Sequence, residues 1–229
     1  CETRIRPDDP PAVKDSVAPD GYSVLHVHSN PSRPHPSDGG LALVYRDTVV
    51  VRPHPLASTL DPHSTFEMQL LKVTSTTPSL TVANIYRPPQ TSLAQFYDKL
   101  ADTLSSPVSA TDRLLVVGDF NCPSSRPSSI DPELRSVLDS LGLEQHVREP
   151  TRLDNLLDLV ITDQPLAVND VRVDDAGLVS DHRLVTASVA VRSGLRKPVE
   201  ITSRRLSGIN TVKFESDLRR SVLFGNQLE

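Results

Sequence analysis

Runs of apolar residues along the chain predict a domain that is rich in β-strands. Residues 21–29 (GYSVLHVHS) and 65–75 (TFEMQLLKVTS) alternate apolar and polar positions, as half-buried strands do. Further strands are predicted at 39–46, 48–54, 79–87, 114–117, 156–163 and 183–191, where apolar residues are more nearly continuous. The runs LLVV and LDLVI among these are typical of strands that are buried on both faces.

Helices are predicted in three segments, each with a residue at or next to its start that can cap a helix. The segments are 92–104, 130–143 and 210–223, and the capping residues are Ser92, Asp131 and Asn210. Pro132 directly after Asp131, and Gly142 near the other end, are the usual start and stop signals. Segments 7–20 and 30–38 are rich in Pro, Asp and Ser and are predicted to be loops. Many strands with few helices indicate a sheet-rich α/β or α+β domain.

Length and composition fit one large domain, or one domain with an appendage. The chain has 229 residues, of which 37% are hydrophobic and 23% charged, so it can bury a sizeable core. Two cysteines make no disulfide framework, and no run of about 18 apolar residues predicts a membrane span. With no Trp and only 4% aromatic residues, a platform that stacks nucleic-acid bases is not expected.

Charge is distributed unevenly along the chain. Residues 192–229 contain eight basic and four acidic residues, a net charge of +4, whereas residues 1–191 have a net charge of −9. An acidic body joined to a basic tail suits a cation-binding domain that is followed by a linker. Ordinary surface variation gives the same distribution, so charge alone does not decide between the two interpretations.

Polar side chains end or interrupt four of the predicted strands. They are Tyr86, Asp119 with Asn121 (in GDFN), Asp158, and Asp181 with His182. Because side chains two apart on a strand share a face, Asp119 and Asn121 are expected to converge on one point. The four strand ends are therefore predicted to face one cleft.

Most of these residues also have an ordinary structural interpretation. A GDFN sequence is typical of a tight turn, Asp-His before a strand is typical of a cap or a surface pair, and Tyr86 is typical of a half-buried strand tyrosine. Asp158 is different, because an unpaired carboxylate inside a core strand costs several kcal/mol. Asp158 therefore requires a partner, and an imidazole is the natural one.

A carboxylate–imidazole pair beside further carboxylates suits the hydrolysis of a phosphate ester. The carboxylate fixes the tautomer of the ring and favours its charged form, so the other ring nitrogen can act on substrate. Asp119 and Asp181 supply the hard oxygen ligands that Mg²⁺ prefers, and Mn²⁺ is the alternative cation. The cation and the imidazolium would stabilise negative charge on the phosphoryl oxygens, while a carboxylate orients the attacking water.

The motifs GDFN, SDH, NIYRPP, the Asp of LDLVI and an initial ET resemble the endonuclease/exonuclease/phosphatase superfamily. More narrowly, their order, together with ETRI, GGLALVYR and SRRLSGINTVKFESDL, resembles the apurinic-like endonuclease domain of non-LTR retrotransposons and the linker after it. The likeness covers nearly the whole chain. It implies a DNase I-like fold of the α/β (α+β) class, a four-layer sandwich of two packed mixed β-sheets flanked by helices.

The resemblance also implies how a metal and a water molecule would be handled. By motif position, Glu2 would bind the metal and Asp181 would assist there. Asp119 would position or deprotonate the attacking water, helped by Asn121, which would also contact the phosphate. The cofactor would be one divalent cation, Mg²⁺ or Mn²⁺.

Other residues would contact the DNA in such an enzyme. Tyr86 would contact the scissile phosphate or the leaving oxygen, and His182, oriented by Asp158, would stabilise the pentacovalent state. Thr151, in EPTR, would touch the DNA backbone. Candidate phosphate contacts near the cleft residues in sequence are Arg87, Arg126, Arg148, Arg152 and Arg183, for each of which solvated surface is the alternative. The reaction would nick one strand of target DNA and leave a 3′-hydroxyl that primes reverse transcription.

The resemblance further predicts domains and partners. Because the chain starts at the ET motif, we expect an endonuclease domain at 1–191 that lacks the first strand of the family and the Asn on it. Residues 192–229 are expected to be a basic linker with a short helix, leading towards a reverse transcriptase domain of the same polyprotein. The expected partners are that domain and double-stranded DNA. We expect a monomer, neither membrane-bound nor secreted, acting in the nucleus or carried in the cytoplasm as a ribonucleoprotein.

Two other functions remain open at this point. The chain is alternatively a remnant without catalysis, which binds nucleic acid or protein, and the missing strand favours that interpretation. The other alternative is a phosphatase or lipid phosphodiesterase of the same superfamily. The NIYRPP motif and the basic tail argue against this alternative.

Overall fold

The computed structural model describes residues 3–15, 17–28, 39–59, 65–105, 112–177, 180–193 and 210–221. The chain divides into two compact units, Cys1–Leu195 and Arg196–Glu229. Within the described residues, all β-strands belong to the first unit, and the second contains α4 (Thr211–Arg219). Among these parts of the chain, no helix is both long and apolar enough to cross a membrane.

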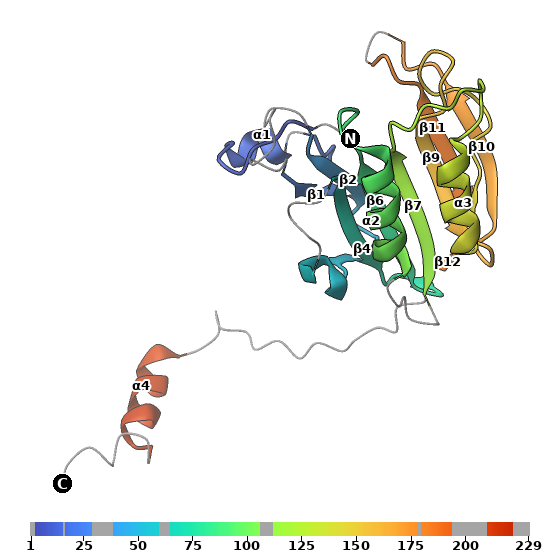
Figure 1. Cartoon of the computed structure of the whole chain (residues 1–229). Helices are drawn as coiled ribbons and strands as arrows, with labels where there is room; N and C mark the ends of the chain where they lie inside the picture. The colour runs from blue at the N-terminus through green and yellow to red at the C-terminus, as the bar shows by residue number, and fades with distance from the viewer. Residues whose placement is uncertain are drawn as a thin grey trace. The chain divides into compact units, whose positions relative to one another are not determined.

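A six-stranded mixed sheet forms the centre of the first unit (Figure 1). Its strands, in spatial order, are β3 (Val51–Pro53), β4 (Glu67–Val73), β6 (Leu80–Tyr86), β7 (Arg113–Asp119), β9 (Asp158–Asp163) and β8 (Leu143–Gln145). Only the pair β6 and β7 is parallel, and the other four pairs are antiparallel. A parallel pair needs a crossover connection, which α2 (Leu93–Ser105) provides.

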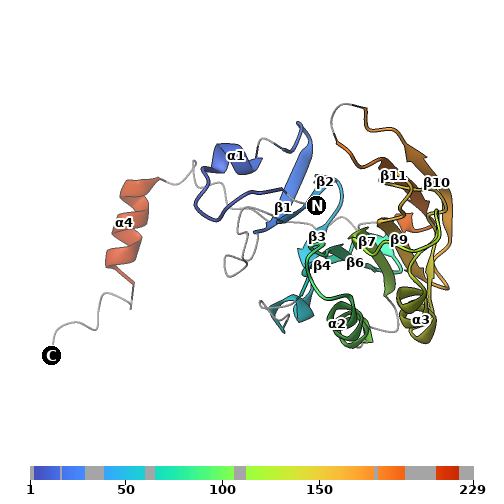
Figure 2. The same ribbon diagram turned by 45° about the horizontal axis from the view of Figure 1, so that its top comes forward.

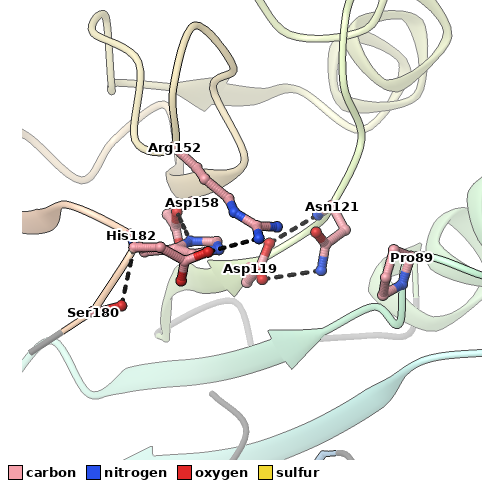
Figure 3. Close-up of a pocket in the computed structure, with 8 residues that line it drawn as sticks. Pro89, Asp119, Asn121, Arg152, Asp158, Ser180 and His182 are labelled. Atoms are coloured by element: carbon pink, nitrogen blue, oxygen red, sulfur yellow. Dashed lines mark hydrogen bonds and ion pairs between the residues drawn. The ribbon is translucent and has the colours of Figure 1, made fainter.

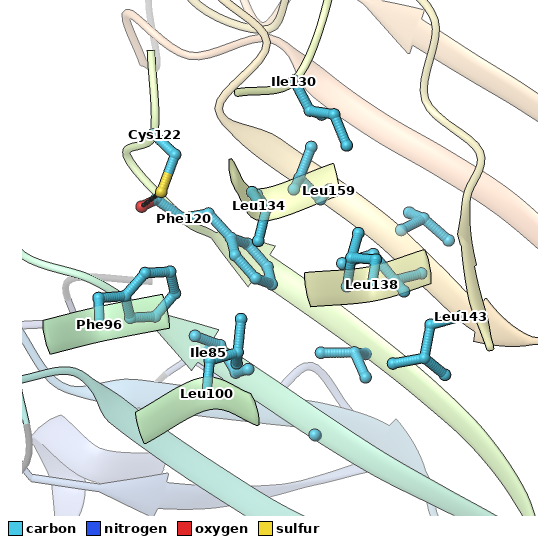
Figure 4. Close-up of a cluster of buried hydrophobic side chains, with 14 of the residues drawn as sticks. Ile85, Phe96, Leu100, Phe120, Cys122, Ile130, Leu134, Leu138, Leu143 and Leu159 are labelled. Atoms are coloured by element: carbon cyan, nitrogen blue, oxygen red, sulfur yellow. Dashed lines mark hydrogen bonds between the residues drawn. The ribbon is translucent and has the colours of Figure 1, made fainter. Parts of the chain in front are cut away.

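Helices α2 and α3 (Pro132–Ser140) cover one face of this sheet (Figures 1 and 2). Phe96 and Leu100 of α2 and Leu134 and Leu138 of α3 are at most 2% exposed and pack over the strands (Figure 4). Each such side chain stabilises the fold by about 1.5–3 kcal/mol. The start of α3 matches the sequence signal, because the Asp131 side chain accepts hydrogen bonds from two backbone N–H groups of the first turn.

The other face of the sheet carries two antiparallel hairpins (Figure 2). They are β1 (Tyr22–Val27) with β2 (Leu41–Arg46), and β10 (Val168–Asp174) with β11 (Leu184–Val189). A second apolar cluster lies on this side, formed by Leu71, Val73, Leu80, Val82 and Leu166, against which residues of both hairpins pack. The predicted α/β sandwich of packed sheets flanked by helices is confirmed.

Hydrogen bonds to polar side chains of β4 also hold the β1–β2 hairpin to the central sheet. The buried Glu67 accepts a hydrogen bond from the Gly40 N–H at 2.7 Å, and Gln69 donates one to the Leu25 carbonyl at 2.8 Å. Buried polar groups are tolerated when they are hydrogen-bonded in this way. The interface between β4 and this hairpin therefore contains buried polar groups as well as apolar ones.

The strands expected from the apolar runs are present as β1, β2, β3, β4, β6, β7, β9 and β11, and the expected helices as α2, α3 and α4. The predicted loop at 7–20 was wrong in part, because α1 (Pro11–Asp15) begins at a proline that suits a helix start. The predicted loop at 30–38 lies outside the described residues.

Several elements, most of them short, were not predicted. They are α1, a 3₁₀ turn at Pro55–Thr59, β5 (Thr76–Thr77), β8, β10 and β12 (Arg192–Ser193). In β10 the pairing with β11 shifts between Asn169 and Arg172, which breaks the regular alternation of the sequence. Because β12 pairs with β5, Arg192 and Ser193 belong to the first unit, although residue 192 was expected to begin the linker.

Candidate active site

Three polar residues stand side by side across the central sheet. The strand register pairs Tyr86 of β6 with Asp119 of β7, and Asp119 with Asp158 of β9. Neighbouring strands lie about 4.8 Å apart, so residues distant in sequence meet at one edge of the sheet. The predicted convergence of strand ends is therefore present for these three residues.

The turn after β7 brings Asp119 and Asn121 together. The Asp119 carboxylate accepts hydrogen bonds from the backbone N–H and from the Nδ2 of Asn121, each at 3.0 Å. Asn121 adopts φ +46°, which only Gly, Asn and Asp visit readily. The two side chains converge as predicted, but through a turn rather than strand alternation, because β7 ends at Asp119.

Gly118 allows the strand to approach its neighbour at this point. Its φ is +138°, and a Cβ atom there would lie 1.8 Å from the Ile85 carbonyl oxygen. No larger residue fits without moving the β6 backbone. The glycine of GDFN is therefore required by the close packing of β6 and β7 that sets the position of Asp119.

Asp158 has the imidazole partner that its place in a core strand required. Its Oδ2 atom lies 2.8 Å from Nδ1 of His182. The hydrogen bond to Asp158 raises the pKa of His182, and burial of the ring opposes this in part. The His182 backbone N–H donates to Oγ of Ser180 at 3.0 Å, which fixes the segment before β11. The charged, oriented imidazole predicted from the sequence is thus what the geometry favours.

Asp181 is held by an arginine from another loop. Nη2 of Arg152 lies 2.6 Å from Oδ2 of Asp181, and the side chain of Asp181 is 69% exposed. The hydrogen bond from Arg152 lowers the pKa of Asp181, so this carboxylate stays charged. Arg152 sits at the end of a tight turn, in which its backbone pairs with that of Asn155.

These residues line a pocket of about 410 Å³ (Figure 3). The lining residues are Pro89, Asp119, Asn121, Arg152, Asp158, Ser180, Asp181 and His182. Ligand atoms of Asp119, Asp158 and His182 lie within 4.8 Å of one another. The carboxylate oxygens of Asp119 and Asp158 in this cluster are hard ligands that suit a divalent cation such as Mg²⁺ or Mn²⁺.

Of three further predicted site residues, two are not among the lining residues and one lies outside the described part of the chain. Tyr86 is 1% exposed and is not among the lining residues, so the direct phosphate contact expected of it is not what this geometry provides. Arg183 lies beside the site, and its Nη1 donates to the Pro150 carbonyl at 3.2 Å. Glu2, the expected metal ligand, lies outside the described residues.

The predicted DNA contact of Thr151 is wrong. The residue is 0% exposed, and its Oγ1 accepts hydrogen bonds from the backbone N–H groups of Leu157 at 3.1 Å and Asp158 at 3.0 Å. Its hydroxyl is used inside the protein and cannot reach DNA. Thr151 instead fixes the start of β9 and so the position of Asp158.

The predicted DNA contact of Arg87 is also wrong. Arg87 is 2% exposed, and its guanidinium donates hydrogen bonds to backbone carbonyls of the protein itself. Its position next to Tyr86 in the sequence suggested a place near the cleft. The sequence does not show that the side chain is buried and not exposed to solvent. The side chain points into the molecule, where no nucleic acid can contact it.

Two lining residues were not singled out in the sequence. Ser180 belongs to the SDH motif, and a serine two residues before a histidine is a signal for the hydrogen bond that its hydroxyl accepts. Pro89 follows Tyr86 by three positions in NIYRPP and contributes an apolar wall. Both residues lie inside motifs that were noted for other side chains, SDH for Asp181 and His182 and NIYRPP for Tyr86.

Known proteins resemble this chain in sequence and fold. Residues 80–186 match the family model described as "Endonuclease-reverse transcriptase". The endonuclease domain of TRAS1, a telomere-specific non-LTR retrotransposon, is 16% identical with a TM-score of 0.55, over 76% of this chain and 81% of that one. No curated protein sequence matches the chain.

Two further solved structures have the same architecture. The 3′-5′ exonuclease NExo from Neisseria meningitidis is 20% identical with a TM-score of 0.60, over 82% of this chain and 86% of that one. An AP endonuclease from Archaeoglobus fulgidus is 16% identical with a TM-score of 0.56, over the same shares, 82% and 86%. Structural similarity at this level of sequence identity shows the fold, which is DNase I-like.

Proposed function

We propose that this chain, a member of the endonuclease/exonuclease/phosphatase superfamily by its fold and by the match of residues 80–186, is a metal-dependent DNA endonuclease domain of a retroelement. The observation that carries the proposal is the meeting of Asp119, Asp158 and His182 in one pocket, with ligand atoms within 4.8 Å. Two carboxylates and a charged imidazole are suited to attack of water on a phosphodiester.

His182 would stabilise the negative charge that develops on the phosphoryl oxygens. Its Nδ1 is bonded to Asp158 at 2.8 Å, so the ring is fixed and its other nitrogen, Nε2, would face the substrate. Because the bond to Asp158 raises the pKa of His182, the ring carries a proton near neutral pH more readily than a free histidine. Asp158 would act through His182 by holding its orientation.

Asp119 and Asn121 would position the attacking water. Their hydrogen bonds to each other fix the carboxylate, and the Asn121 amide would also contact the phosphate. A divalent cation would be held by the Asp119 carboxylate, with Asp181 and Glu2 as the further ligands that the sequence motifs imply, and would supply charge for the phosphoryl oxygens when bound. Arg152, which now pairs with Asp181, would contact a phosphate of the DNA backbone.

The cellular setting follows from the same proposal. The matched family is described as an endonuclease joined to a reverse transcriptase, which supports a polyprotein in which the two activities are coupled. Nicking would leave a 3′-hydroxyl that primes reverse transcription on nuclear double-stranded DNA. The domain would act as a monomer, and α4 with its flanking basic residues would lead towards the reverse transcriptase domain.

A plasmid-nicking assay tests this function. Supercoiled DNA is incubated with the protein and Mg²⁺ or Mn²⁺, and conversion to the open circle is measured. His182→Ala should slow nicking by about 10²-fold or more, as expected when a charge-stabilising group is lost. His146→Gln is the control, because His146 bonds Thr162 Oγ1 at 2.8 Å outside the pocket, and it should nick at the parent rate.

Other functions of the superfamily give different results in the same experiment. A phosphatase or lipid phosphodiesterase would hydrolyse inositol phosphates or sphingomyelin faster than it nicks supercoiled DNA. A catalytically inactive remnant would hydrolyse none of them. Equal nicking by the parent and by His182→Ala would show that the assigned roles are wrong.

A further inference from the structure

Arg87 carries a buried guanidinium, each of whose three nitrogens donates to a backbone carbonyl near the candidate active site, and Nη1 also donates to Oγ1 of Thr91. It is the largest fully buried side chain in the described part of the chain. Its Nε donates to the Phe120 carbonyl at 2.8 Å, and its Nη2 donates to the Asn121 carbonyl. Its Nη1 donates to the Thr91 carbonyl at 2.7 Å, and the Phe96 ring lies against it, with 5.8 Å from Cζ to the ring centroid.

The main chain of Arg87 contacts the same turn. The Arg87 N–H donates to the Asp119 carbonyl at 3.0 Å, and Nδ2 of Asn121 donates to the Arg87 carbonyl at 2.9 Å. Together with the guanidinium bonds, Arg87 therefore binds a main-chain oxygen of each of Asp119, Phe120 and Asn121. No other described residue is bonded to the turn at all three positions.

The turn needs such support, because its conformation is not one that the backbone prefers. Asn121 has φ +46°, a left-handed conformation that is unfavourable for a non-glycine residue, although asparagine tolerates it better than most. The Asn121 amide divides its donors between the Arg87 carbonyl and the Asp119 carboxylate. If Arg87 did not hold the backbone carbonyl of Asn121, that residue would be free to rotate. Its side-chain amide would then leave the Asp119 carboxylate, and Asp119 would no longer be fixed in the site.

We propose that Arg87 is a positioning residue, whose guanidinium clamps the turn 119–121 so that Asp119 and Asn121 face the pocket. The catalytic consequence rests on the proposed function, whereas the clamp itself does not. Arg87 acts through Asp119 and Asn121 and touches no substrate, because it is 2% exposed. This role replaces the phosphate contact that its place in the sequence predicted.

The clamp requires arginine rather than any cation. The guanidinium serves three carbonyls, of Thr91, Phe120 and Asn121, from three different nitrogens of a rigid plane. A lysine ammonium is a single point and cannot reach carbonyls on both sides. A buried cation is tolerated only when it is well hydrogen-bonded. A lysine ammonium at this position would lack enough of these bonds and would also be shielded from water. Arg87→Lys is therefore a strong perturbation, although it conserves charge.

The test compares Arg87→Lys and Arg87→Met with the parent in the full chain. Arg46→Lys is the matched control, because the Arg46 guanidinium also lies over an aromatic ring, 5.5 Å from the Tyr22 centroid, but at the surface of β2. Turnover of supercoiled DNA, DNA affinity at several salt concentrations and the melting temperature are measured for each. Both Arg87 variants should lower kcat per folded molecule by about 10-fold or more, as expected for misplaced catalytic groups. Their DNA affinity and its salt dependence should match the parent.

Two results would overturn the clamp as a positioning device. If the variants melt at a lower temperature but turn over at the parent rate per folded molecule, Arg87 is merely structural. If the slope of log affinity against log salt falls by about 1, Arg87 contacts a phosphate instead. Arg46→Lys should change neither kcat nor the slope.

A second measurement needs no variant and no activity. In NMR spectra of the parent, the Arg87 Nε–H and the Asn121 side-chain amide should exchange slowly with solvent, because each is buried and bonded. Fast exchange of the Arg87 Nε–H would overturn the clamp even if Arg87→Lys fails to fold. A parent that fails to nick DNA but shows slow exchange would reject the proposed function and leave the clamp supported.

Discussion

Asp119 of β7 and Asp158 of β9 lie directly opposite each other on neighbouring antiparallel strands. Like charges in such a pair destabilise a sheet. Each carboxylate therefore has its own donors, which are the Asn121 N–H and Nδ2 for Asp119 and the His182 ring for Asp158. The arrangement keeps two acids together at the end of the sheet and makes the pocket a favourable place for a positive charge.

Addition of a divalent cation should stabilise the domain. A ligand that binds only the folded state adds about 2.7 kcal/mol at a concentration of 100 times its Kd. For a unit of this size, we expect the melting temperature to rise by roughly 5–10 °C on saturation with Mn²⁺, measured by calorimetry. Asp119→Asn should abolish most of this shift, because it removes a carboxylate of the Asp119, Asp158 and His182 cluster.

The control for this prediction is Asp174→Asn, which neutralises an exposed carboxylate at the end of β10. It should retain the full shift with Mn²⁺. An equal shift in Asp119→Asn and in the parent would mean that the cation binds elsewhere.

The His182–Asp158 pair should stabilise the domain more at low pH than at high pH. The hydrogen bond to Asp158 raises the pKa of His182 above its ordinary value of 6.5, so the folded state holds this proton more tightly than the unfolded state. The stabilisation is therefore complete below pH 6.5 and is lost as the pH rises through the folded pKa. The melting temperatures of the parent and of Asp158→Asn should differ more at a pH of about 5.5 than at about 9.

Asp174→Asn serves as the control here as well, since its carboxylate is exposed, and its effect should be the same at both pH values. A difference between the parent and Asp158→Asn that does not change with pH would argue against a charged His182.

Removal of the Thr151 hydroxyl should destabilise the domain at the start of β9. Thr151→Val leaves the N–H groups of Leu157 and Asp158 without their acceptor, and each unsatisfied buried group costs about 1–3 kcal/mol. We expect a loss of roughly 2–4 kcal/mol in the free energy of unfolding, measured with urea. Thr151→Ser keeps the oxygen and should lose much less, whereas similar losses in both variants would contradict the assigned role.

Arg152 should contribute to DNA binding through a phosphate contact. It lies in the pocket and pairs only with the exposed Asp181 among the described residues, so a phosphate competes for it at little cost. Arg152→Ala should weaken binding of duplex DNA, and the slope of log affinity against log salt should fall by about 1. Arg135→Ala, on the helical face of the sheet, should leave the slope unchanged. An unchanged slope in Arg152→Ala would remove this residue from the interface.

Most of the central sheet was predictable because its strands are apolar runs. The strands β6, β7 and β9 need apolar residues on both faces, and Asp131 with Pro132 marks the start of α3. The local sequence is therefore enough to predict these four elements. The strands β8 and β10 were missed, because β8 has only three residues and the pairing of β10 with β11 shifts register, so neither leaves a regular pattern. The partner of Asp158 was also predictable, because a carboxylate in a core strand must be paired.

The sequence by itself determined which residue types the site contains, because a carboxylate in an apolar run and the motifs GDFN and SDH are local features of the chain. Only the tertiary structure decided which side chains face the pocket. Arg87 and Thr151 sit next to site residues in sequence, yet both point inward and hold the backbone. Orientation of a side chain depends on which carbonyls and N–H groups other strands bring near it, and that information is absent from any local stretch of sequence.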